Sequence, residues 1–117
     1  MGYKNEFESI VGAAKDLAAL FEGSLLYKDY LKYKQALELD PDLLERVKAY
    51  KKISMDLELK RLRDNGVSFD EERRIAYQNS ELNLHQTARD FLSCEQKLLD
   101  LYKQVMVLIS DACEMDF

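Results

Sequence analysis

The side chains that could do chemistry are few: one histidine, His85, and two cysteines, Cys94 and Cys113. No Ser, Cys or Asp stands at a spacing that would orient His85 as a general base. Glu81 precedes it by four residues, whereas helical carboxylate metal sites need Glu-x-x-His pairs on facing helices. We therefore expect His85 to be exposed or to begin a helix. We expect no enzymatic activity, no catalytic residue and no bound cofactor.

The two cysteines are 19 residues apart on what the pattern predicts to be one helix. That spacing is about 28 Å along a helix axis, while a disulfide needs Cα atoms within about 7 Å. Two thiols are also too few for a structural metal site, which takes four ligands. We expect Cys94 and Cys113 to be small buried apolar side chains. The alternative is a redox or metal-sensing protein whose Cys94 and Cys113 act as ligands across a subunit interface.

Glu95 is the one polar residue in the apolar stripe of the last predicted helix. A buried Glu can be a metal ligand, but no Glu-x-x-His pair accompanies it. We predict instead that Glu95 sets the register of the helix and forms a salt bridge or reaches the rim.

Basic residues gather in the middle of the chain, where residues 28–63 contain ten Lys or Arg against seven Asp or Glu. Tyr27, Tyr30 and Tyr33 recur there at intervals of three. Aromatic and basic side chains together can stack on RNA and neutralise it, so RNA binding through the third helix is one alternative. The net charge of −5 argues against indiscriminate nucleic-acid binding. We expect the tyrosines to lie in a core or a protein interface.

Length and composition predict a single all-α domain over residues 1–117. The chain is 47% apolar and 33% charged, and it contains one Pro and four Gly. So few helix-breaking residues are typical of a chain that forms long helices. Acids at Glu6, Glu8 and Asp16 argue against a signal peptide, and no apolar run approaches the ~20 residues of a membrane span. We expect a cytoplasmic protein without membrane contact.

Five helices follow from apolar periodicity and capping residues. The first follows Asn5, which forms a capping box with Glu8, and ends at Gly23 in a left-handed conformation. The second begins near Ser24. The third begins at Asp40-Pro41, as an N-cap followed by proline at the first helical position, and runs to about Arg63. The fourth begins at Ser68 with a capping box through Glu71, and Asn79-Ser80 could interrupt its thin stripe.

The last helix carries the strongest stripe, from Leu84 to Ala112. Its 29 residues span about 43 Å, whereas a compact chain of this length is roughly 35 Å across. We therefore predict an elongated antiparallel bundle with a frayed tail at 114–117, and a homodimer in which this helix meets a second copy. The predicted interface residues are Tyr27, Tyr30, Tyr33, Phe91, Leu98, Tyr102 and Val105.

The order and spacing of several segments resemble the YlbF/YmcA family of small helical bacterial proteins. The segments are the amphipathic first helix, Tyr30-Leu31-Lys32-Tyr33-Lys34-Gln35-Ala36, Leu39-Asp40-Pro41-Asp42, Asn65-Gly66, and Phe91-Leu92-Ser93-Cys94-Glu95-Gln96-Lys97-Leu98. In the last of these, Cys94 stands where the family has alanine.

The resemblance implies an oligomeric, non-enzymatic regulatory protein of the bacterial cytoplasm. It implies partnership with other helical proteins that steer messenger-RNA processing by ribonuclease Y, and links to competence, biofilm formation and sporulation. Some members of the family use cysteines to bind iron–sulfur clusters in such complexes, and this chain offers only Cys94 and Cys113.

Overall fold

The computed structural model describes residues 2–63 and 66–114, and in this part of the chain it contains five helices and no strand. The helices are α1 (Lys4–Glu22), α2 (Leu25–Glu38), α3 (Pro41–Arg63), α4 (Phe69–Asn83) and α5 (Gln86–Cys113). α5 is the longest, with 28 residues. The predicted all-α fold with a long C-terminal helix is confirmed.

Three helices begin at the side-chain caps that the sequence indicates. The Ser24 hydroxyl accepts a hydrogen bond from the Tyr27 N–H at 3.1 Å. The Asp40 carboxylate accepts one from the Leu43 N–H at 3.2 Å, and Pro41 is the first residue of α3. Each cap satisfies a backbone N–H that has no partner within its helix. Ser68 does the same for Glu71 at the start of α4, at 3.1 Å.

Other predicted boundaries are wrong. α1 begins at Lys4, and Tyr3 occupies its cap position without a side-chain hydrogen bond, so Asn5 is already helical. Gly23 has φ −82° rather than a left-handed conformation, because the Ser24 cap restarts the helix at once. α4 continues through Asn79. α5 begins two residues after Leu84, since the extended backbone of His85 separates it from α4.

The core lies where α2, α3, α4 and α5 meet. Its buried residues are Leu37, Leu43, Val47, Leu82, Ala88 and Phe91. α1 supplies none of them, because no residue of α1 is buried. The N-terminal half of α5 is therefore held by its own chain, whereas α1 is attached only at one end.

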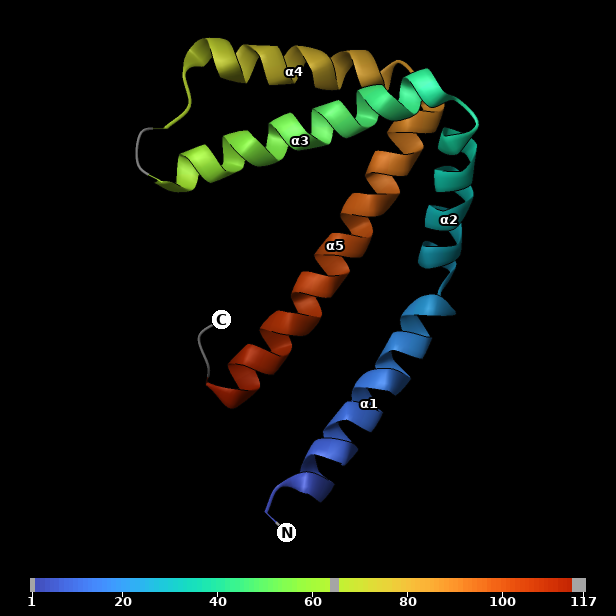
Figure 1. Cartoon of the computed structure of the whole chain (residues 1–117), viewed down its shortest axis with the longest axis vertical. Helices are drawn as coiled ribbons and strands as arrows, with labels where there is room; N and C mark the ends of the chain where they lie inside the picture. The colour runs from blue at the N-terminus through green and yellow to red at the C-terminus, as the bar shows by residue number, and fades with distance from the viewer. Residues whose placement is uncertain (1, 64–65, 115–117) are drawn as a thin grey trace.

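The molecule is elongated and flat, with extents of 56 × 39 × 19 Å and a radius of gyration of 18.5 Å. A compact chain of this length would have a radius of about 13 Å. Figure 1 shows the reason: α3 and α4 form a hairpin that extends to the left from the core, while α1 and the C-terminal half of α5 extend downward in the view. α5 ends at Cys113, and its C-cap residue Glu114 is left-handed with φ 54°. Residues 115–117 of the predicted tail lie outside the described residues.

Candidate interaction surface

The first exposed apolar stripe lies on α1. Phe7 is 62% exposed, Ile10 66% and Leu20 72%. α1 contacts α2 and no other helix within the described residues. Most of this stripe therefore has the spacing of a packed helix but no helix among the described residues that covers it.

The second exposed stripe lies on the C-terminal half of α5. Tyr102, Leu108 and Ile109 are exposed there, Leu108 to 69%, and Val105 is half-buried. The same helix buries Ala88, Phe91 and Cys94 in its N-terminal half. One continuous stripe thus serves the chain's own core at one end and is open at the other.

The predicted tyrosine stripe lies on α2, and its middle residue contacts α5. Tyr27, Tyr30 and Tyr33 are all half-buried. The Tyr30 ring centroid is 5.5 Å from that of Phe91, which is 6% exposed. Among the predicted interface residues, Phe91 therefore belongs to the core, and Leu98 is half-buried. Tyr102 has its ring most open to another chain.

Glu95 forms the predicted salt bridge, with Lys51 of α3. The Lys51 Nζ is 2.6 Å from the Glu95 carboxylate, and the Glu95 side chain is 18% exposed. The same Nζ lies 5.7 Å from the centre of the Phe91 ring. Glu95 thus ties α5 to α3 beside the core, as a partly buried charge with its counter-charge in contact.

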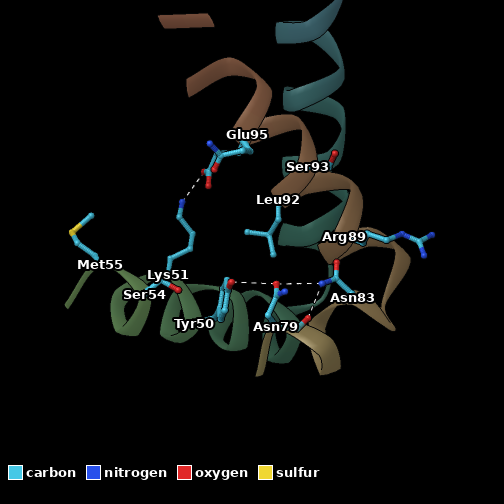
Figure 2. Close-up of a pocket in the computed structure, with 11 residues that line it drawn as sticks. Tyr50, Lys51, Ser54, Met55, Asn79, Asn83, Arg89, Leu92, Ser93 and Glu95 are labelled. Carbon is cyan, nitrogen blue, oxygen red and sulfur yellow. Dashed lines mark hydrogen bonds and ion pairs between the residues drawn. The ribbon is translucent and has the colours of Figure 1, made fainter. Parts of the chain in front are cut away.

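An open cleft of about 600 Å³ lies between α3, α4 and α5. On its floor the Tyr50 hydroxyl donates to the Asn79 Oδ1 at 3.1 Å, and the Asn83 amide donates to the Asn79 backbone carbonyl at 2.8 Å. Figure 2 shows these side chains on one side and the Lys51–Glu95 pair on the other. Sequence reasoning missed Asn79 as a contact because it appeared only as a possible helix breaker. The first bond connects α3 to α4 and the second lies within α4, and neither forms a nucleophile–base pair.

The two cysteines have opposite environments. Cys94 is buried and its thiol donates to the Leu26 carbonyl at 3.3 Å. Burial raises the pKa of Cys94, and the nearby Asp29 carboxylate raises it further, so the thiol stays protonated and unreactive at neutral pH. Cys113 is exposed, so the prediction that it is buried is wrong. Within the described residues, no group of three His, Cys, Asp or Glu could hold a metal ion.

Two basic side chains near the end of α3 pair with carboxylates of α4. Lys60 is 2.8 Å from Glu71 and Arg61 is 3.3 Å from Glu72. The hydrogen bond from Lys60 lowers the pKa of Glu71. These pairs neutralise part of the charge that RNA binding would use.

His85 is the exposed N-cap residue of α5, as the sequence indicates. Its Nε2 is 3.3 Å from a guanidinium nitrogen of Arg46. This contact joins α3 to α5, and it is made with a cation rather than with the carboxylate that orients a catalytic histidine.

No curated protein and no solved structure is significantly similar to this chain. None of the helices within the described residues has the length and apolar character to cross a bilayer. Residues 10–114 match a family described as control of the competence regulator ComK, and the chain belongs to this YlbF/YmcA family.

Proposed function

We propose that this protein is a non-enzymatic regulatory module of the cytoplasm that acts by docking other helical proteins. The family's description supports a regulatory role. The observation that carries the mechanism is the exposed apolar stripe at the C-terminal half of α5, at Tyr102, Leu108 and Ile109.

A helical partner fits this stripe for physical reasons. Burying apolar area is the main favourable term in association, and tyrosine provides large contact area at low entropic cost. The polar side of the same half-helix carries Asp100, Lys103 and Asp111. Charge there would influence the association rate more than the affinity.

The finer form of the proposal follows the family resemblance. The partners would be proteins that steer messenger-RNA processing by ribonuclease Y, with effects on competence, biofilm formation and sporulation. Contact with nucleic acid would be made by those partners. We also propose that the protein is a homodimer, since its apolar stripes exceed what its own core covers.

The test compares two variants of α5 in the native host after deletion of the gene. Tyr102→Glu places a carboxylate on the exposed stripe. Lys103→Glu places the same group on the polar side of α5, about 100° around the helix from Tyr102 and about 140° from Leu108. We expect wild type and Lys103→Glu to restore transcription of ComK-dependent genes and processing of ribonuclease Y-dependent transcripts. Tyr102→Glu should lose both, because a charge in an apolar contact costs binding tenfold or more, roughly 1.4 kcal/mol.

All three proteins should show the same helicity and melting temperature, since Tyr102 is 57% exposed. Full restoration by Tyr102→Glu would place the docking surface elsewhere. Loss of regulation in a folded His85→Ala variant would point to chemistry at His85 and contradict the non-enzymatic proposal.

A further inference from the structure

The proposed docking stripe on α5 does not explain why α1 also has an exposed apolar stripe. We propose that α1 pairs antiparallel with α1 of a second copy, about a two-fold axis that passes beside Gly12. This inference rests on the homodimer proposed above and names the surface that forms it.

α1 has the residue pattern of a helix that pairs with another helix. The apolar positions recur at alternating spacings of four and three, which is the heptad spacing of paired helices. They are Tyr3, Phe7, Ile10, Ala14, Leu17 and Phe21. The two flanking positions of each heptad are also mainly apolar, at Val11, Ala13, Ala18 and Leu20. A stripe this wide is typical of a helix covered by another element along its length.

The pattern is self-complementary when the second helix runs in the opposite direction. With the two-fold axis at residue 12, Phe7 lies opposite Leu17 of the second copy, and Ile10 lies opposite Ala14. Each layer then combines residues of different size or shape, which fills space evenly. A parallel pair would instead place Ala14 against Ala14 and Phe7 against Phe7, so its layers would alternate between gaps and crowding.

The charges of α1 are compatible with the antiparallel pair. In an antiparallel pair the two flanking rows meet one residue to either side of the centre of the core layers, so Val11 meets Val11 on one side and Ala13 meets Ala13 on the other. Lys4 then faces Ala18 of the second copy and Glu6 faces Leu20, so each charged side chain lies along an apolar neighbour with its head in water. Glu8 and Lys15 lie on the outer side of the heptad pattern. No two like charges oppose each other across the contact, so electrostatic repulsion does not disfavour this register.

The structure leaves the required face open. Tyr3, Phe7, Ile10 and Val11 are each more than half exposed. Within the described residues α1 contacts α2 and no other helix, and Leu17 and Phe21, toward its C-terminal end, are half-buried. In Figure 1 the N-terminal end of α1 extends beyond the end of α5. A second α1 therefore meets an open face at the N-terminal half, and its own N-terminal half would complete the cover of Leu17 and Phe21. The two-fold operation repeats the contact on both copies, so the interface is closed and does not propagate into a fibre.

The test uses single cysteines in a Cys113→Ser background, where the remaining Cys94 is buried. A short bis-maleimide should cross-link Val11→Cys to itself, because Val11 faces Val11 across the axis. Lys4→Cys and Ala18→Cys should cross-link to each other after subunit exchange. Neither should cross-link to itself, because the same position on the two copies is separated by about 21 Å along the helix axis. The Cys113→Ser background alone is the control and should give no product.

Strong self-cross-linking of Lys4→Cys would indicate a parallel pair and overturn the inference. Failure of Val11→Cys to cross-link in a protein of two-chain mass would place the dimer contact elsewhere; it would overturn the inference and leave the proposed function standing.

A second pair of variants measures the same contact without cysteines. Ile10→Glu should halve the mass measured by light scattering, because it places a carboxylate in the centre of the pair. Asn5→Glu adds the same group on the outer side of α1 and should leave the mass at two chains. Equal masses for Ile10→Glu and wild type would contradict the pairing. A one-chain mass for wild type would overturn both the pairing and the homodimer, but not docking through α5.

Discussion

Cys94 and Glu95 are consecutive residues of α5, and each could be taken for a functional group. Their surroundings give them structural roles. Cys94 donates its thiol to the Leu26 carbonyl of α2, and Glu95 binds Lys51 of α3. Two neighbouring polar atoms therefore join three helices at the edge of the core. A redox role would need Cys94 to leave this contact first.

The two thiols should differ sharply in reactivity. With a thiol-specific reagent at pH 8, Cys113 should react at once and Cys94 on the order of 100-fold more slowly, because Cys94 must wait for local opening. Protein in urea should show two equally fast thiols. Equal rates in the folded protein would mean that Cys94 is accessible, which would favour the redox and metal-sensing alternative.

The Cys94 thiol also makes the stability of the fold depend on pH. Its pKa is raised above the ordinary value of 9.0, so the folded state holds the proton more tightly than the unfolded state. The resulting stabilisation is present below pH 9 and is lost as the pH rises through the folded pKa. A Cys94→Ala variant should lack this part of the alkaline loss in a urea titration.

At the scale of the helices, a helix cap and a core residue contribute different amounts to the free energy of unfolding. Asp40→Ala should lower the free energy of unfolding by about 1 kcal/mol, because α3 loses its N-cap. Leu37→Ala should lower it by about 2–5 kcal/mol, because Leu37 is 1% exposed and its truncation leaves a cavity in the core. Urea midpoints should rank the two in that order. A larger effect of Asp40→Ala would mean that the core is not where α2 and α3 meet.

Most of the helices could be predicted from the sequence because caps and apolar periodicity are local signals. Ser24, Asp40 and Ser68 each act on a backbone group three residues away. The failures are also local: Asn5 had a capping pattern, but the chain was already helical at Lys4. Periodicity indicates which face of a helix is apolar but not which element covers it. The sequence could therefore predict the stripe of α5, while only the packing separates its buried half from its open half.

At the scale of the whole molecule, the exposed stripes are the feature to explain. Monomeric proteins rarely leave large contiguous apolar surfaces in water. Here α1 and the C-terminal half of α5 both do so, on the same side of the core (Figure 1). A second copy along α1 and a helical partner on α5 would cover both. The elongated shape follows from helices that serve contacts outside their own chain.

The central claim is that these stripes are covered by another chain, and the mass in solution tests it most directly. Light scattering of the purified protein at micromolar concentration should give twice the 13.7 kDa of one chain. The value should fall toward one chain for Ile10→Glu and stay unchanged for Asn5→Glu. A wild-type mass of one chain across that concentration range would contradict the claim.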